Sequence, residues 1–153
     1  MAVHYCGGVD LAPSNPDLTS ALDAKMGLEL LELTAERVVG RMPVVGNTQP
    51  FGLWHGGASC VLAETLASLG SYAHGQPDRI GVGVDLNATH HRPARSGWVT
   101  GTATALRLGR SVVTYEVVLT GDDGQRVCTA RVTCQLVTPT GDPAGQGGPN
   151  FSG

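Results

Sequence analysis

Four features around one predicted helix start have complementary chemistry. Gln49 lies six residues before His55, the pair Gly56-Gly57 follows directly, and Glu64 lies nine residues after His55. The N-terminus of a long helix offers unpaired N–H groups and a partial positive charge, and glycine lets a ligand approach that backbone closely. Gly56 or Gly57 therefore suits an oxyanion, whereas Glu64 suits a general base or a nucleophile.

These residues also have structural interpretations. A glutamate in a buried helix can accept hydrogen bonds from strand N–H groups, and a histidine at a helix start can be satisfied by the backbone. The combination with Gln49 and the glycine pair favours a site. Phe51 and Trp54, beside the helix start, suit either an aromatic acyl pocket or interface packing.

The segment 55–74 (HGGASCVLAETLASLGSYAH) predicts one long helix of roughly 30 Å. Small and apolar residues fill most of its positions, which indicates a helix enclosed on every side. Glu64 lies roughly 13 Å along the axis from the helix start, so the two cannot easily act together within one chain. Antiparallel helices across a two-fold interface would bring them together.

The residues before this helix predict a short helix and two strands. Asp17 or Thr19 can cap a helix that ends at Gly27, because glycine readily adopts the conformation that closes a helix. Residues 28–45 mix apolar and charged residues at short spacing, which indicates two strands joined near residues 35–37.

Four strands are predicted after the long helix. Between residues 80 and 87, apolar residues at even positions alternate with Gly, Asp and Asn at odd positions, so the even-numbered side chains should share one face. A second strand is expected near residues 98–106. The inward faces of the third and fourth strands are predicted to consist of Val113, Tyr115, Val117 and Leu119, and of Cys128, Ala130, Val132, Cys134 and Leu136.

One long helix and about six mostly antiparallel strands predict an α+β fold in which a twisted sheet curls around the helix. One sheet cannot cover a helix that is apolar on all sides, so a second subunit is expected on the remaining side. The chain divides into an irregular lead-in at 1–17, one domain at 18–138 and a tail at 139–153, where a Gly- and Pro-rich composition indicates disorder.

Composition limits what this chain of 153 residues does. Charged residues make up 15% and the formal net charge is −3, so no nucleic-acid partner is expected. The absence of a long apolar run and of signal-peptide regions predicts a cytoplasmic protein without a membrane partner. The four cysteines show no metal-ligand spacing with the five histidines, so we expect reduced core cysteines and no metal.

Three stretches of the sequence carry a family resemblance, which covers about residues 18–138. They are MPVVGNTQPFGLWHGGASCVLAETLAS, VDLNATHHRPARSGWVTGTATALRLGRS and RVCTARVTCQLV. The chain resembles the hotdog-fold acyl-CoA thioesterases of the phenylacetate-type group. Within that group it is most similar to the enzymes that hydrolyse 1,4-dihydroxy-2-naphthoyl-CoA in menaquinone synthesis and to their proofreading relatives of enterobactin synthesis.

The resemblance implies a hotdog fold, a dimer of dimers with active sites at the dimer interface, and hydrolysis of an aromatic-type acyl-CoA to free acid and CoA without a cofactor. It implies that Glu64 is the catalytic carboxylate, which attacks the thioester or activates a water. Gln49 and His55 would position and polarise the thioester, and the Gly56 N–H would bind the oxyanion. Ser68 would orient the acyl group or the water.

Two stretches suit the phosphate groups of CoA, because they combine basic side chains with loop N–H groups. They are His90, His91 and Arg92, beyond a predicted strand, and Leu108, Gly109, Arg110 and Ser111, in a predicted turn. The alternative is a pair of solvated loops. Gly83 either leaves room for the pantetheine arm or serves strand packing.

Two other functions are compatible with this fold. A hydratase acting on enoyl-CoA would need an Asp/His pair at the helix approach, and no Asp lies near His55. A non-catalytic acyl-CoA-binding protein would not need Glu64. The carboxylate and its neighbours therefore favour the thioesterase hypothesis.

Overall fold

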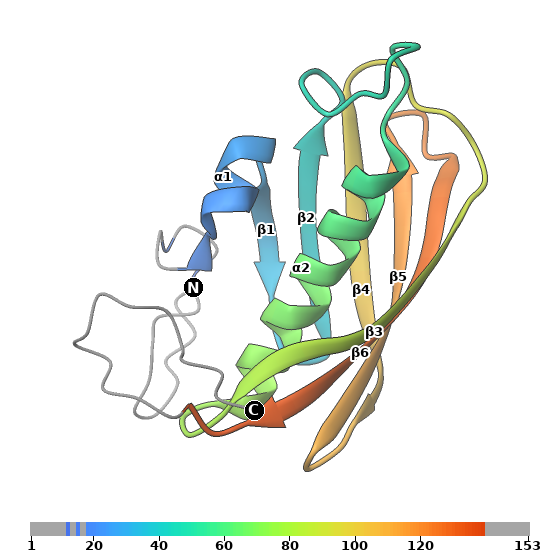
Figure 1. Ribbon diagram of the computed structural model, residues 1–153. Coiled ribbons are helices and arrows are strands. Elements are labelled where there is room, and N and C mark those ends of the chain that lie inside the picture. Colours follow the sequence, from blue (N-terminus) through green and yellow to red (C-terminus); the bar gives the residue numbers. More distant parts are fainter. Residues whose placement is uncertain (1–11, 13–14, 16–17, 140–153) are drawn as a thin grey trace.

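The computed structural model of the chain describes residues 12, 15 and 18–139 (Figure 1). The predicted lead-in and tail lie almost wholly outside these residues. In chain order the elements are α1 (Ala21–Met26), β1 (Glu29–Leu33), β2 (Arg37–Pro43), α2 (Gly56–Gly75), β3 (Ile80–His90), β4 (Trp98–Leu108), β5 (Val112–Gly121) and β6 (Arg126–Val137). These are the two helices and six strands that the sequence predicts.

The strands form one antiparallel sheet in the order β1-β2-β4-β5-β6-β3. Helix α2 lies along one face of this sheet, which curves around it (Figure 1). The predicted α+β hotdog architecture, an antiparallel sheet wrapped around one long central helix, is thereby confirmed. No helix in the described part of the chain is long and apolar enough to cross a bilayer.

Helix α1 is capped by Ser20, so the predicted caps Asp17 and Thr19 are wrong. Ser20 Oγ accepts a hydrogen bond from the Asp23 N–H at 3.1 Å, and the Asp23 carboxylate accepts one from the Ser20 N–H at 3.2 Å. This reciprocal pair needs an acid three residues after the cap, and Asp23 has that spacing from Ser20 alone. Gly27 ends the helix with a φ of 72°, as predicted.

The core between α2 and the sheet contains the side chains predicted for β5 and β6. The buried residues there are Val113, Tyr115, Val117, Leu119, Cys128, Ala130, Val132, Cys134 and Leu136. Ten residues of α2 are buried, among them Ala63, Leu66 and Ala67. Gly57 and Glu64 of α2 are exposed, and Glu64 lies at the edge of the sheet beside Gly83 of β3. The sheet therefore covers one side of the helix, and the expected second subunit would cover the other.

Strand β3 differs from the predicted alternation. Gly81 and Gly83 face α2: a Cβ on Gly81 would lie 2.2 Å from the Ser71 Cβ. The pairing with β6 slips between Gly83 and Asp85, so Val84 is bulged and 58% exposed. The even-numbered residues therefore do not share one face. Before the bulge, the odd positions 81 and 83 face α2, which passes so close that only glycine fits there. The bulge at Val84 then shifts the alternation by one residue.

Candidate active site

The loop before α2 is held in place by backbone and amide hydrogen bonds. The Asn47 side chain donates to the carbonyls of Met26 and Pro43, each at 2.8 Å, and the Asn47 carbonyl accepts from the His55 N–H at 2.9 Å. Thr48 and Trp54 form an isolated β-bridge across the loop. These bonds fix the loop and with it the start of α2.

His55 is the N-cap residue of α2. Its Nδ1 accepts a hydrogen bond from the Gly57 N–H at 2.8 Å. Because Nδ1 accepts, the ring proton lies on Nε2 and is available as a donor. The Gly56 N–H donates to no group among residues 18–139, whereas the Gly57 N–H is occupied. Of the two glycines, Gly56 therefore has the N–H that an oxyanion can take.

Gln49 is fixed in the same loop. Its N–H donates to the Leu53 carbonyl at 2.8 Å, and its own carbonyl accepts from the Gly52 N–H at 3.0 Å. The side-chain Oε1 accepts from the Phe51 N–H, which leaves the amide NH₂ of Gln49 as a donor. Gln49 and Gly56 line one cavity of about 380 Å³.

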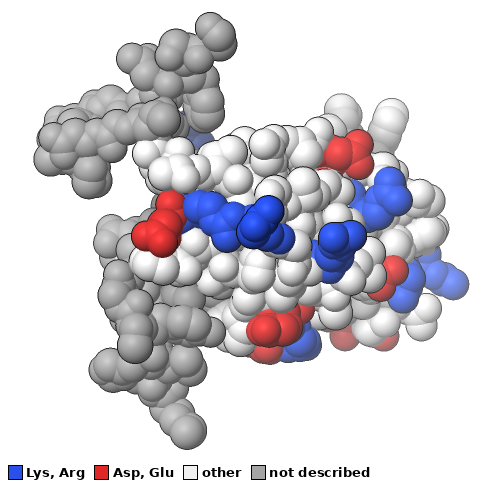
Figure 2. All heavy atoms as spheres, turned by 90° about the horizontal axis from the view of Figure 1, so that it is seen from below, with Lys and Arg blue, Asp and Glu red and all other residues white. Residues whose placement is uncertain are grey.

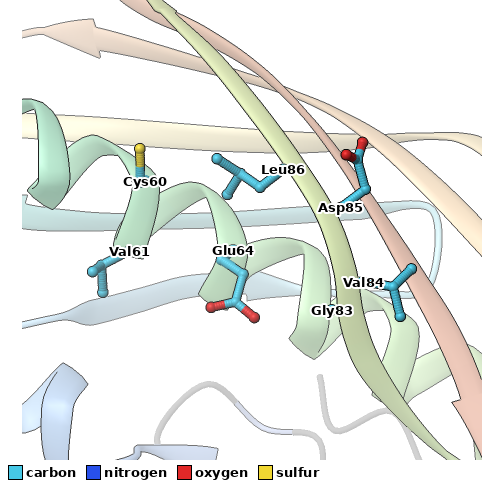
Figure 3. Close-up of a pocket in the computed structure, with 7 residues that line it drawn as sticks. All are labelled: Cys60, Val61, Glu64, Gly83, Val84, Asp85 and Leu86. Carbon is cyan, nitrogen blue, oxygen red and sulfur yellow. The ribbon is translucent and has the colours of Figure 1, made fainter.

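Glu64 projects from the middle of α2 beside Gly83 of β3 (Figure 3). A Cβ on Gly83 would lie 2.7 Å from Glu64 Oε1, so glycine at this position makes room for the carboxylate. The two residues line a cavity of about 320 Å³ between helix and strand. Its other lining residues are Cys60, Val61, Val84, Asp85 and Leu86.

Glu64 also borders a second and larger cavity, of about 790 Å³, towards the C-terminal half of α2. Ser68 lies in its wall one turn after Glu64, and the remaining lining residues are Leu18, Thr19, Ser20, Asp23, Thr65, Leu69, Tyr72, Ile80 and Gly81. Thr65 Oγ1 donates to the Asp23 carboxylate at 2.8 Å and so ties α1 to this side of α2. The carboxylate of Glu64 thus stands between two cavities.

The structure separates the predicted residues into two groups. Gln49 and Gly56 line one cavity, and Glu64 lines two others that share no residue with it. Along α2 the eight residues from Gly56 to Glu64 correspond to roughly 12 Å. A single chain therefore does not bring the carboxylate to the helix start.

Comparison with known proteins identifies the family. Residues 51–128 match the model of the Thioesterase superfamily. The chain belongs to this superfamily. A proofreading thioesterase of Klebsiella pneumoniae is 42% identical over 123 residues, which cover 80% of this chain and 90% of that protein. The predicted family is confirmed, and the chain is a hydrolase that acts on thioester bonds.

Solved thioesterase structures share the fold. A thioesterase from Haemophilus influenzae superimposes with a TM-score of 0.77 at 33% identity, over 81% of this chain and 87% of that one. A mutant thioesterase from Pseudomonas aeruginosa gives a TM-score of 0.74 at 40% identity, over 78% and 87% of the two chains.

The two stretches predicted to bind CoA lie at opposite ends of α2 in this thioesterase. His90, His91 and Arg92 line the cavity of Gln49 and Gly56, and His90 Nε2 lies 2.9 Å from the position of a Cβ on Gly56. Leu108 is the last residue of β4 and not part of the turn as predicted; the stretch 108–111 lies at the C-terminal end of the helix, where His74 Nε2 is 3.1 Å from the Gly109 carbonyl oxygen. A 20-residue helix, roughly 30 Å long, separates them.

The cysteines of this thioesterase have no activating surroundings in the part of the chain that the structure describes. Burial is the main cause that raises the pKa of Cys128 and of Cys134 above the ordinary thiol value, so both thiols remain protonated. Cys60 is half-buried and free. Residues 18–139 contain no cluster of metal-ligating side chains, and Cys6 lies outside the described residues.

Sequence reasoning missed the residues that line the larger cavity beyond Ser68. Tyr72 follows Glu64 and Ser68 at a spacing of four, and Leu69 follows Thr65 at the same spacing, so all lie along one side of the helix. This periodicity could have identified them. Trp54 is buried, its indole N–H donates to Ser59 Oγ at 2.7 Å, and it lines the cavity of Gln49 and Gly56, whereas Phe51 is 84% exposed.

Proposed function

We propose that this thioesterase hydrolyses an acyl-CoA with an aromatic acyl group, such as 1,4-dihydroxy-2-naphthoyl-CoA of menaquinone synthesis, to the free acid and CoA. The position of Glu64 carries the proposal. Its carboxylate stands between two cavities, and no group in the described part of the chain forms an ion pair or side-chain hydrogen bond with that carboxylate. An unpaired carboxylate at such a junction is available for chemistry.

The two cavities suit the two halves of a thioester. The larger, of about 790 Å³, combines apolar Leu69 and Ile80 with the ring of Tyr72 and would hold the aromatic acyl group. The smaller, of about 320 Å³, lies beside Gly83 and would hold the pantetheine arm. The thioester carbonyl would then lie at Glu64, where both cavities meet.

Glu64 would act on this carbonyl in one of two ways. As a general base it takes a proton from water, and the water oxygen attacks the carbonyl carbon. As a nucleophile its own oxygen attacks, and water then hydrolyses the resulting anhydride. On either path the carbonyl oxygen becomes an oxyanion, the C–S bond breaks, and CoA leaves as a thiolate that takes up a proton. Ser68 would orient the acyl group or the water.

A second copy of the chain would complete the site. When two α2 helices pack antiparallel around a two-fold axis, the Gly56 N–H of one copy meets Glu64 of the other. Gln49 lines one cavity with Gly56, and His55 precedes Gly56 in the chain, so the Gln49 amide and the His55 Nε2–H would polarise the same carbonyl. Such a pair agrees with the open side of α2, and two pairs would form the expected dimer of dimers.

The edge of β3 supports the same pairing. β3 is the last strand in the sheet order, so one of its edges has no strand partner within residues 18–139. Antiparallel pairing of this edge with its copy would place the Ile80 end of one β3 beside the His90 end of the other. The stretch 108–111 of one copy and residues 90–92 of the other would then approach one CoA molecule.

The test is a panel of acyl-CoA substrates, including 1,4-dihydroxy-2-naphthoyl-CoA and benzoyl-CoA, assayed with a thiol reagent for CoA release. We expect Glu64→Gln to lower kcat by about 100- to 10,000-fold, and Gln49→Ala to lower it less. Glu116→Gln, an exposed position on β5, is the matched control and should retain the wild-type rate. CoA release from no substrate, or full activity of Glu64→Gln, would overturn the proposal.

A further inference from the structure

Three arginines gather around the turn between β4 and β5, at the C-terminal end of α2. Arg79, between α2 and β3, donates from Nη1 to the backbone carbonyl of Arg110, 31 residues away in the sequence. Arg107, near the end of β4, places its Nε 3.5 Å from the position of a Cβ on Gly109. The tertiary structure thus brings Arg79 to a turn that carries Arg110 and follows Arg107 of β4.

Backbone hydrogen bonds hold this turn in place. The Gly109 N–H donates to the Val112 carbonyl at 3.1 Å, and a β6 N–H donates to the Ser111 carbonyl at 2.8 Å. A Cβ on Gly109 would lie 2.4 Å from the Val112 carbonyl oxygen, so the tight turn requires glycine. The N–H groups of Arg110 and Ser111 donate to nothing in the described chain and are available to an anion.

No carboxylate neutralises this cluster within residues 18–139. The ion pairs there involve three other arginines, and Asp78, next to Arg79 in the chain, pairs with none of the cluster. Figure 2 views the molecule from the end that carries the turn, and basic side chains form a band across this face. Positive charge that no carboxylate pairs attracts an anion.

We infer that Arg79, together with Arg107 and Arg110, binds a phosphate group of the substrate's coenzyme A. The inference rests on the proposed acyl-CoA substrate. A guanidinium presents a fork of N–H donors that matches phosphate oxygens, and the turn adds backbone N–H groups. The Arg110 carbonyl positions Arg79 for this contact. The diphosphate and the 3′-phosphate of CoA share this chemistry, and the substrates below distinguish them.

The experiment compares thioesters of one acyl group with CoA, with dephospho-CoA and with N-acetylcysteamine, which has no phosphate. In Arg79→Gln we expect the KM for acyl-CoA to rise about tenfold while kcat stays the same. The ratio of kcat/KM for acyl-CoA to that for the N-acetylcysteamine thioester should fall by the same factor, and this ratio does not depend on the folded fraction. If Arg79→Gln lowers kcat/KM for acyl-dephospho-CoA by the same factor as for acyl-CoA, Arg79 binds the diphosphate. If the factor is smaller for acyl-dephospho-CoA, Arg79 binds the 3′-phosphate.

Arg37→Gln is the matched control, because Arg37 is an exposed arginine whose charge is paired with Glu32. In Arg37→Gln the ratio of kcat/KM for acyl-CoA to that for the N-acetylcysteamine thioester should equal the wild-type ratio. The same wild-type ratio in Arg79→Gln would overturn the inference. If the wild-type protein cleaves no thioester, the proposed function fails, and calorimetric titration with CoA tests the inference separately. Binding about tenfold weaker in Arg79→Gln supports it, whereas equal binding in both proteins, or none in either, overturns it.

Discussion

A side chain at position 83 would collide with Glu64: a Cβ on Gly83 would lie 2.7 Å from Glu64 Oε1. The carboxylate on the helix can lie against β3 only because the strand residue is glycine. Two residues 19 positions apart in the sequence thus shape one cavity wall together.

The first prediction concerns this contact. Gly83→Ala should displace the Glu64 carboxylate and lower kcat/KM for acyl-CoA by about 100-fold, because small displacements of a reacting group are costly. The free energy of unfolding should change little, since alanine fits a strand backbone and the side chain that must move has a free end. Steady-state kinetics and urea unfolding measure both, with Asn87→Ala on the same strand as control. Wild-type kinetics in Gly83→Ala would contradict the proposed role of Glu64.

The neighbouring glycine should respond differently. A Cβ on Gly81 would lie 2.2 Å from the Ser71 Cβ, which cannot swing away because Ser71 is buried on α2. We expect Gly81→Ala to lower the free energy of unfolding by about 1–3 kcal/mol, as overpacking does. Urea unfolding measures this value. The double variant Gly81→Ala/Ser71→Gly should recover part of the lost free energy of unfolding. If the losses of the two single variants add up in the double variant, the two residues do not meet.

The third prediction separates the two roles of His55. His55→Ala removes the N-cap of α2 and the Nε2–H donor, so stability should fall by about 1 kcal/mol and kcat/KM by about 100-fold. His55→Asn keeps a side chain that accepts from the Gly57 N–H, so it should recover stability but not activity. Thermal unfolding and the CoA-release assay measure the two effects. Full activity in His55→Asn would exclude the ring as a donor to the thioester.

The fourth prediction tests the antiparallel helix pair. Val61 is half-buried near the midpoint between Gly56 and Glu64, where the two-fold axis of the proposed dimer would pass. Val61→Cys, in a background with Cys6 and Cys60 changed to serine, should form a covalent dimer with a short bis-maleimide on a denaturing gel. Gln125→Cys in the β5–β6 turn should form none under the same conditions. A Val61→Cys protein that stays monomeric on the gel would argue against this pairing.

Much of the fold follows from local patterns. The alternation of β5 and β6 correctly predicts their buried faces, because every second side chain of a strand points to the same side. The small and apolar residues of 55–74 predict α2 within one residue at each end. The Ser20 cap is missed because three neighbouring polar residues can each start a helix, and only the distance to Asp23 selects one.

The sequence by itself determined the secondary structure, the family and the residues that can do chemistry, since these depend on residue types and short spacings. The tertiary structure decided the direction of Gly81 and Gly83, because a glycine has no side chain to show which face it presents and the bulge at Val84 depends on the pairing with β6. It also decided that Arg79 meets Arg110, since contacts between distant segments leave no local pattern. The separation of Glu64 from Gly56 follows from the helix rise alone. One sheet covers only one side of a helix, and this is the physical reason to expect a second subunit on the other side of α2.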